Sequence, residues 1–226
     1  MPRPPADAAL LVIDVQRGFD APVWGPRNNP GAEANIARLL AAWREASRPV
    51  FHVLHDSRLP ASPLRPGAPG NAPKPEAEPR PGEAIYRKTV NAAFIGTALE
   101  ADLRGTGIGA LVIVGLTTNH CVSTTARMAG NLGFDTYVVS DATAAFDRAG
   151  LDGRVRPAAE VHASALSDLQ GEFAAVIDTA AVLGAVRARP AGRRQTPTSC
   201  PTPPPRSTGP VSTVACARRP RCTPRP

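Results

Sequence analysis

A cysteine directly follows an apolar stretch of the chain, at a place that suits a nucleophile. Residues 110–114 read ALVIV, which predicts a buried strand, and the next residues read GLTTNHC and end at Cys121. A helical pattern follows over residues 122–132, so Cys121 is expected on the first turn of a helix. Free N–H groups there lower the pKa of a thiol, and they can bind the oxyanion that forms when a thiolate attacks a carbonyl. Cys121 is therefore a candidate nucleophile, and the alternative is a small buried apolar residue.

Two charged residues are candidates for the same chemistry. Asp14 ends an apolar strand predicted over residues 8–15, where a carboxylate must be paired or hydrogen-bonded. Lys88 is one of only two lysines among 26 basic residues. A chain that uses arginine for general positive charge keeps lysine where it needs a compact point charge in a tight site. Asp14 could instead cap a loop or helix, and Lys88 could be present by chance.

Strand and helix patterns alternate along the chain. Strands are expected at residues 8–15, 50–54, 84–87, 110–114, 136–140 and 173–179, and helices at 33–47, 97–105, 122–132 and 157–169. Gly105 is expected to cap the second helix. Residues 57–82 contain eight prolines and are expected to be irregular. This alternation predicts an α/β fold with three α/β/α layers around a mostly parallel, roughly six-stranded sheet.

The candidate residues gather at one predicted edge of this sheet. Ligands of parallel α/β folds bind at the carboxyl ends of the strands. Asp14, the pair His55 and Asp56, and the loop before Cys121 all follow predicted strands. Together with Lys88 they indicate an acyl-transfer site that uses an acid, a lysine and a cysteine, without a catalytic histidine.

Charge is distributed unevenly along the chain. The formal net charge is +7, but residues 184–226 hold nine arginines and no acidic residue, which leaves a net charge of −2 for the first 183 residues. The folded part therefore offers no footprint for nucleic acid. No apolar run approaches the roughly 18–20 residues that span a bilayer, and the N-terminus has no secretory layout. No membrane partner is expected, and the protein is expected to be cytoplasmic.

The sequence divides into a domain over residues 1–186 and a tail over residues 187–226. The tail is rich in proline and arginine and has almost no large apolar residue, so it is expected to be disordered. An arm that binds nucleic acid or an acidic partner is the functional alternative. The other three cysteines also lie in the tail and match no zinc pattern. Cys121 is therefore the only cysteine of the domain.

Four segments resemble the isochorismatase-like cysteine hydrolases, a superfamily that includes nicotinamidases and carbamoylsarcosine amidases. They are IDVQRGF, YRKTVNAAFIGTALEADLR, VIVGLTTNHCVSTTARMAGNLGF and VVSDATAAFDR, and the resemblance spans residues 8–183. It implies an α/β/α fold and a catalytic triad of Asp14, Lys88 and Cys121. It also implies a cis peptide bond between Leu116 and Thr117, and an oxyanion hole made by the N–H groups of Thr117 and Cys121.

The resemblance implies a hydrolase that cleaves a small amide-type C–N bond through a thioester, in which Asp14 moves the proton and Lys88 stabilises the thiolate. Two alternatives stay open. An isochorismatase-type vinyl-ether hydrolase shares the fold but typically lacks the cysteine, and a non-catalytic assembly or binding domain does not need all three groups. A small-molecule substrate and a homo-oligomer are expected. Loops 17–30 and 57–82 are expected to set the specificity.

The remaining candidates concern the substrate pocket and a metal. Residues near the triad members in the sequence are expected to line the pocket: Phe19, Trp24, His55, Asn91, Phe94 and Leu116. The aromatic residues among them could instead pack in the core. Nicotinamidases bind a metal near the second strand, but the segment HVLHDSRLPASPL lacks the later histidines of that pattern. No metal and no cofactor are therefore expected, and His52, His55 and Asp56 are the ligands of the alternative. His120 is expected to point away from Cys121, and His162, which lies in a helical pattern, is expected to be structural.

Overall fold

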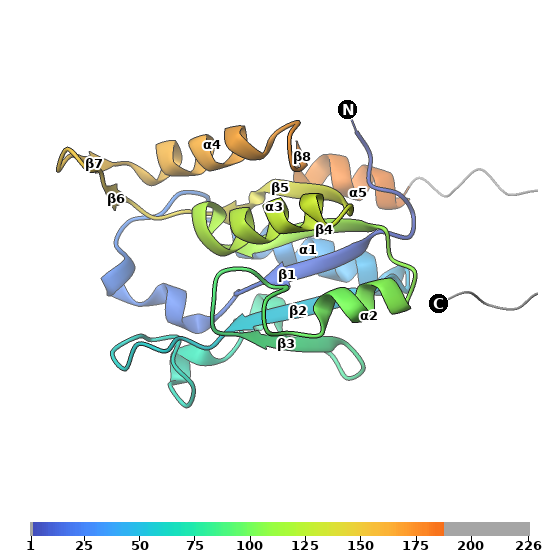
Figure 1. The fold of residues 1–226 in the computed structure, drawn as a ribbon, viewed down its shortest axis with the longest axis horizontal. Coiled ribbons are helices and arrows are strands. Elements are labelled where there is room, and N and C mark those ends of the chain that lie inside the picture. The colour runs from blue at the N-terminus through green and yellow to red at the C-terminus, as the bar shows by residue number, and fades with distance from the viewer. Residues whose placement is uncertain (1, 188–226) are drawn as a thin grey trace, which may run out of the picture. The chain divides into compact units, whose positions relative to one another are not determined.

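Six parallel strands form the sheet at the centre of the protein (Figure 1). The computed structural model describes residues 2–187, so the expected tail lies outside the described residues apart from Arg187. The strands lie in the order β3-β2-β1-β4-β5-β8, with every neighbouring pair parallel. Their bounds are β1 (Ala9–Ile13), β2 (Val50–His55), β3 (Ala84–Lys88), β4 (Ala110–Leu116), β5 (Asp135–Ala144) and β8 (Ala175–Ile177).

Helices cover both faces of this sheet (Figure 1). They are α1 (Ala32–Glu45), α2 (Leu99–Gly105), α3 (Ser123–Asn131), α4 (Ala158–Leu169) and α5 (Thr179–Arg187). Leu10 and Val12 of β1 pack in one core with α1 and α5, whereas Leu11 and Ile13 pack in a second core with α2, α3 and α4. Because successive side chains of a strand point to opposite faces, a strand covered on both sides is apolar throughout. The predicted three-layer α/β/α fold is confirmed.

Glycine at position 115 lets β4 approach β1 at the edge where the candidate residues lie. Gly115 has a φ of 122°, and a Cβ atom there would lie 1.9 Å from the carbonyl oxygen of Ile13. No other residue type fits without moving one of the strands. The β4–β5 pairing shifts its register between Ile113 and Gly115, whereas the β1–β4 pairing continues without a shift to Ile13 and Gly115.

Four parts of the structure differ from the expected elements. The helix α2 ends at Gly105, but its C-cap is Thr106 and the left-handed residue is Gly107, so Gly105 is not the cap. β5 continues to Ala144, and its last three residues are all buried, whereas the sequence pattern ended this strand at Ser140 because polar residues follow. The sequence patterns also missed α5 and a two-stranded antiparallel hairpin of β6 (Arg148–Ala149) and β7 (Val155–Arg156). Such short strands are too brief to show a period.

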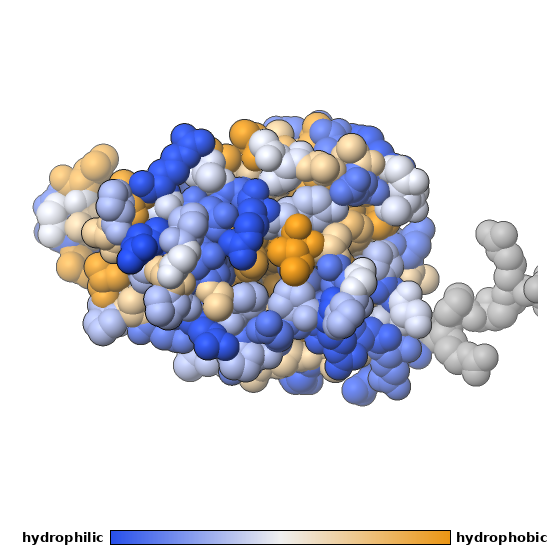
Figure 2. All heavy atoms as spheres, turned by 90° about the horizontal axis from the view of Figure 1, so that it is seen from below, coloured by the Kyte–Doolittle hydropathy of each residue, from blue (hydrophilic) through white to orange (hydrophobic). Residues whose placement is uncertain are grey.

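The surface mixes polar and apolar side chains, as Figure 2 shows for one face. Large apolar residues with exposed side chains are scattered over several elements: Val23, Leu59, Ile85, Ile95, Leu151 and Val155. Scattered apolar residues are ordinary on a protein surface. Within residues 2–187, none of the helices has both the length and the apolar character required to cross a membrane.

Candidate active site

Asp14, Lys88 and Cys121 lie together at the carboxyl edge of the sheet. Asp14 directly follows β1, Lys88 ends β3, and Cys121 lies in the turn that follows β4. Lys88 Nζ donates a hydrogen bond of 2.6 Å to Asp14 Oδ2, and neither side chain is exposed. A carboxylate oxygen of Asp14, a ring nitrogen of His55 and Cys121 Sγ all lie within 4.8 Å of one another. Residues far apart in the sequence thus form one compact cluster.

The backbone turns sharply at Asp14. Its φ of 51° lies in the left-handed region, which aspartate tolerates better than most residues. The N–H of Asp14 still donates to the Val53 carbonyl at 2.8 Å, and the N–H of Gln16 donates to the Asp14 carbonyl at 2.8 Å. The end of β1 is therefore held to β2 while the chain leaves the sheet, and the carboxylate stays at the sheet edge.

Burial controls the ionisation of Asp14 and Cys121. It raises the pKa of Asp14 above the ordinary value, and the neighbouring Lys88 ammonium opposes this only in part. Asp14 Oδ1 is buried and has no hydrogen-bond partner among residues 2–187. Burial also raises the pKa of the Cys121 thiol, and the charge of Asp14 raises it further. The expectation that the pKa of the Cys121 thiol is lowered is wrong, because Cys121 is only 7% exposed and lies near the Asp14 carboxylate.

His55 contacts the lysine of the cluster. It is the register partner of Lys88 across β2 and β3, and its Nδ1 lies 3.2 Å from Lys88 Nζ. An ammonium group can only donate, so Nδ1 is the acceptor and the imidazole is neutral. Burial lowers the pKa of His55, and the positive charge of Lys88 lowers it further. Lys88 therefore donates to two acceptors, the Asp14 carboxylate and the His55 ring.

The geometry disfavours a metal ion in both arrangements of possible ligands. Within the cluster, the Lys88 ammonium already lies 2.6 Å from Asp14 and 3.2 Å from His55, where a cation would compete with it. In the alternative set, His52 faces the other side of the sheet and its Nε2 lies 2.9 Å from Glu83 Oε2. Asp56 accepts hydrogen bonds from Arg87 and Asn71. His52, His55 and Asp56 therefore do not converge on one point.

The loop after β4 bends around Thr117. The Leu116–Thr117 peptide bond is cis, and Thr118–Val122 form one π-helical turn that leads into α3. The sequence pattern predicted Cys121 on the first turn of a helix. In the structure Cys121 lies in the π-helical turn that precedes α3. The Thr117 carbonyl accepts from the N–H groups of His120 and Val122, at 3.1 and 3.2 Å. The N–H of Thr117 donates to no backbone carbonyl within the described residues.

A cavity of about 250 Å³ opens beside this loop. Its lining residues are Val23, Trp24, Thr117, Asn119, His120, Phe146, Asp147, Arg148 and Ala149. Of the expected substrate contacts, only Trp24 lines it. Asn91 does not line this cavity, but its Oδ1 is 3.6 Å from Cys121 Sγ. We refer to this space as the inner cavity.

Three of the expected substrate contacts belong to the core. Leu116 has no exposed surface, and Phe94 stacks on Phe134 with ring centroids 6.0 Å apart. Phe19 packs against Trp24 at 5.1 Å and supports it from the side of the core. The structure does not place these three side chains on the wall of the inner cavity, because they fill the space between the sheet, the loops and the helices.

Polar residues on the outer side of the inner cavity were missed by the sequence analysis. His120 bridges Thr117 Oγ1 and Arg148 Nη1, at 3.2 and 3.0 Å from its two ring nitrogens. His120 was expected to point away from Cys121, and it lines the inner cavity, which Cys121 does not. His162 does have a structural place, because it is buried against Thr118 Oγ1 at 2.8 Å. The sequence signal that could have pointed to Arg148 is the segment VVSDATAAFDR, which ends at this residue and is one of the four segments that carry the family resemblance.

Gln16 and Asn71 hold the strand end that carries His55. Gln16 accepts from the His55 N–H at 2.8 Å and donates to the Asn71 carbonyl at 2.8 Å. Asn71 Nδ2 donates to the His55 carbonyl at 3.1 Å. The proline-rich loop that contains Asn71 is thus pinned to the sheet edge. Nothing in the loop sequence alone predicts this contact, which depends on the meeting of two distant segments.

Comparisons with known proteins cover nearly all of the described residues. Residues 8–181 match the family model of the Isochorismatase domain. The isochorismatase family protein YrdC of Bacillus subtilis (strain 168) is 48% identical over 171 residues, 76% of this chain and 91% of that protein. Nicotinamidase 3 of Arabidopsis thaliana is 29% identical over 185 residues, 76% of this chain and 84% of that protein. The crystal structure of an isochorismatase-family protein from Chromobacterium violaceum ATCC 12472 has a TM-score of 0.79 and 48% identity, and covers 82% of this chain and 98% of its own.

Proposed function

The chain belongs to the isochorismatase family, and we propose that it is a cysteine hydrolase that cleaves a small amide-type C–N bond through a thioester. One observation carries the proposal. A buried carboxylate with a free oxygen lies beside a buried thiol, and a lysine ammonium holds its other oxygen at 2.6 Å. Hydrolysis of a C–N amide bond is also the reaction that the name of nicotinamidase 3 states for that relative.

The raised pKa values of Asp14 and Cys121 suit a proton that is passed between them. In the first step, Asp14 takes the thiol proton while Cys121 Sγ attacks the substrate carbonyl carbon and forms a C–S bond. Lys88 keeps the carboxylate in place and stabilises the developing negative charge on sulfur. The tetrahedral oxyanion accepts hydrogen bonds from the N–H groups of Thr117 and Cys121.

The same carboxyl group completes the cycle. Protonated Asp14 gives its proton to the leaving nitrogen, the C–N bond breaks, and an amine or ammonia leaves a thioester on Cys121. Asp14 then takes a proton from water, whose oxygen attacks the thioester carbon. The C–S bond breaks, the carboxylic acid product leaves, and the thiol is restored with its proton. No further reactant is required.

The nucleophile is tested by ammonia release from a panel of small primary amides. Cys121→Ala and Cys121→Ser should keep the fold and lose at least about a thousandfold in kcat/KM, since a serine hydroxyl has no strong base here to activate it. Quenching the wild-type reaction with the best amide should reveal the acyl group on the peptide that contains Cys121 by mass spectrometry.

The control is a full-length protein in which the three tail cysteines, Cys200, Cys216 and Cys222, are replaced by serine. It should retain wild-type turnover. If Cys121→Ala hydrolyses the best substrate at a near-normal rate, the covalent mechanism is wrong, and the vinyl-ether or direct-water reaction takes its place. A wild-type protein inactive on all C–N substrates would favour the non-catalytic alternative.

A further inference from the structure

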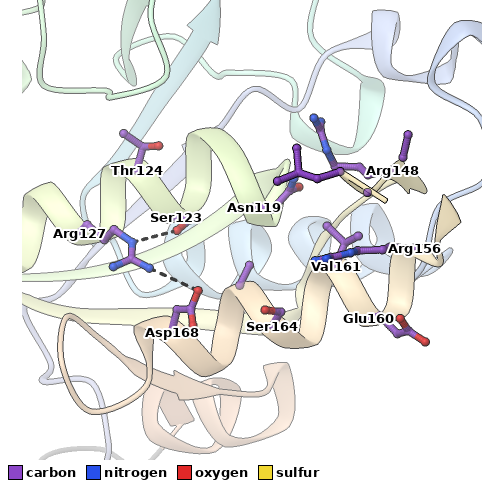
Figure 3. Close-up of a pocket in the computed structure, with 14 residues that line it drawn as sticks. Asn119, Ser123, Thr124, Arg127, Arg148, Arg156, Glu160, Val161, Ser164 and Asp168 are labelled. Atoms are coloured by element: carbon purple, nitrogen blue, oxygen red, sulfur yellow. Dashed lines mark hydrogen bonds and ion pairs between the residues drawn. The ribbon is translucent and has the colours of Figure 1, made fainter. Parts of the chain in front are cut away.

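The inner cavity shares a wall with a larger hollow on the surface. The hollow has a volume of about 790 Å³ and lies between α3, α4 and the β6–β7 hairpin (Figure 3). Asn119, Arg148 and Ala149 line both spaces. Arg148 therefore contacts both spaces and lies between the loop after β4, which contains Thr117, and the surface of the protein.

Arg148 has no carboxylate partner within ion-pair distance among residues 2–187, in contrast to several other arginines. Its contact is His120 Nε2, at 3.0 Å from Nη1. Burial and the Arg148 charge lower the pKa of His120, so this ring is a neutral acceptor and balances none of the charge. The nearest acid in the sequence, Asp147, accepts from the Ala158 N–H at 2.7 Å.

The hairpin places like charges opposite each other. Arg148 is the cross-strand partner of Arg156, and Arg156 also lines the hollow. Like charges directly opposite on an antiparallel pair destabilise it, and an anion between or beside them relieves the repulsion. The labelled side chains in Figure 3 show both arginines on the hairpin side of the hollow.

His120 connects the guanidinium to the oxyanion loop. Its Nε2 faces Arg148 and its Nδ1 lies 3.2 Å from Thr117 Oγ1. The guanidinium and Thr117 are thus separated by one imidazole ring and two hydrogen bonds. A substrate whose carbonyl oxygen faces the Thr117 N–H could therefore place an anionic group at Arg148 if only a short spacer separates the two groups.

We propose that Arg148 binds a carboxylate of the substrate, so that the preferred substrates are small amides that also carry a carboxylate on a short spacer. This inference rests on the proposed amidase function of the same site. The guanidinium offers a planar set of donors that matches a carboxylate. Arg148 is then a specificity-determining residue, and Arg156, which lines the hollow but not the inner cavity, is not.

The test compares two amides of equal chain length, succinamate, which carries a carboxylate, and butyramide, which carries none. The wild-type ratio of kcat/KM should favour succinamate by on the order of 10- to 100-fold, as expected for a charge-assisted hydrogen bond. Arg148→Gln should bring this ratio close to one, mainly through a higher KM for succinamate. The matched control Arg156→Gln should keep the wild-type ratio.

A second readout separates this inference from the proposed function. Succinate should raise the melting temperature of wild-type protein and of Arg156→Gln, and not that of Arg148→Gln, whether or not any amide is hydrolysed. A succinate effect without turnover would leave the anion site standing and remove the amidase proposal. Equal turnover of both amides, or an equal response of the two arginine variants in either assay, would overturn the assignment of Arg148.

Discussion

Two buried lysines of this protein hold carboxylates, and their surroundings differ. Lys88 donates to Asp14 and to a neutral histidine beside the thiol of Cys121. The only other lysine, Lys74, bridges Asp20 and Glu33, and Glu33 also forms two hydrogen bonds with Arg27. We call these the Lys88 cluster and the Lys74 cluster. Both lysines are nearly inaccessible, at 1% and 5% exposed.

The pKa values of Glu33 and Asp14 are shifted in opposite directions. Burial raises the pKa of Glu33, but the hydrogen bonds from Arg27 and Lys74 outweigh it and hold the pKa at about 2. Burial raises the pKa of Asp14 as well, and there the single lysine does not outweigh it. The Lys74 cluster balances two cations against two acids, whereas Asp14 keeps an unpartnered oxygen. A balanced cluster stabilises the fold, and an acceptor left free beside a thiol is available for proton transfer.

The largest expected effect concerns Lys88. Lys88→Met should lower kcat/KM by at least about a thousandfold, because the developing thiolate and the Asp14 carboxylate both lose their cation. The melting temperature should change little, since Asp14 can take up a proton once its partner is gone. Ammonia release and thermal unfolding measure the two quantities on the same preparation.

The matched variant is Lys88→Arg, which keeps the charge. It should remain nearly inactive, because a guanidinium is too large and too rigid for the space between Asp14 and His55. Activity within tenfold of wild type in either variant would show that Lys88 is structural, like Lys74. The distinction between the two clusters would then fail.

The next effect concerns Glu33 and is a loss of stability. Glu33→Gln leaves Arg27 and Lys74 close together with one exposed acid, and should lower the free energy of unfolding at pH 7 by about 3 kcal/mol. Turnover per folded molecule should stay at the wild-type level. Because the pKa of Glu33 is lowered in the fold, its contribution is present above about pH 4.5 and is lost as pH falls through about 2.

Denaturant unfolding of both proteins between pH 7 and pH 2 measures this difference. The gap between wild type and Glu33→Gln should narrow steadily as the pH falls below about 4.5. A gap that stays constant with pH would mean that the charge of Glu33 is not what stabilises the cluster. A fall in turnover per folded molecule would connect the Lys74 cluster to the chemistry.

The alternation of strands and helices, and the clustering of Asp14 and Cys121 at one edge of the sheet, were accessible from the sequence because each depends on a local pattern. An apolar run that ends in Asp14 predicts a buried strand with a polar end, and the same logic applies to the run before Cys121. Parallel topology then brings the carboxyl ends to one edge. The pKa of Cys121 could not be read in this way. It depends on the depth of burial and on the distance to Asp14, both of which arise only from packing.

Arg148 and His120, which line the inner cavity, were not assigned a place there for a related reason. Arg148 and His120 are ordinary surface types whose meaning comes from a hairpin too short to show a period. Of the three aromatic candidates, Trp24 lines the inner cavity and Phe94 and Phe19 pack in the core, because an aromatic residue looks the same in sequence whether it faces a cavity or the core. Scarcity of lysine predicted that Lys88 occupies a tight site, and it predicts the same for Lys74.

The smallest expected effect tests that argument at Lys74. Lys74→Met should lower the free energy of unfolding by only about 1–2 kcal/mol, because Glu33 keeps both hydrogen bonds from Arg27 and the Asp20 side chain is 66% exposed. Lys74→Arg should be no more stable than Lys74→Met, since a buried point charge between two carboxylates leaves no room for a planar guanidinium. Chemical unfolding at pH 7 compares the three proteins, with turnover of the best amide as the control for an intact Lys88 cluster. A Lys74→Arg protein as stable as wild type would show that the compact size of lysine does not explain why this arginine-rich chain keeps its two lysines. The sequence argument for Lys88 would then lose its basis. The observed contacts of Lys88 with Asp14 and His55 would still support its role.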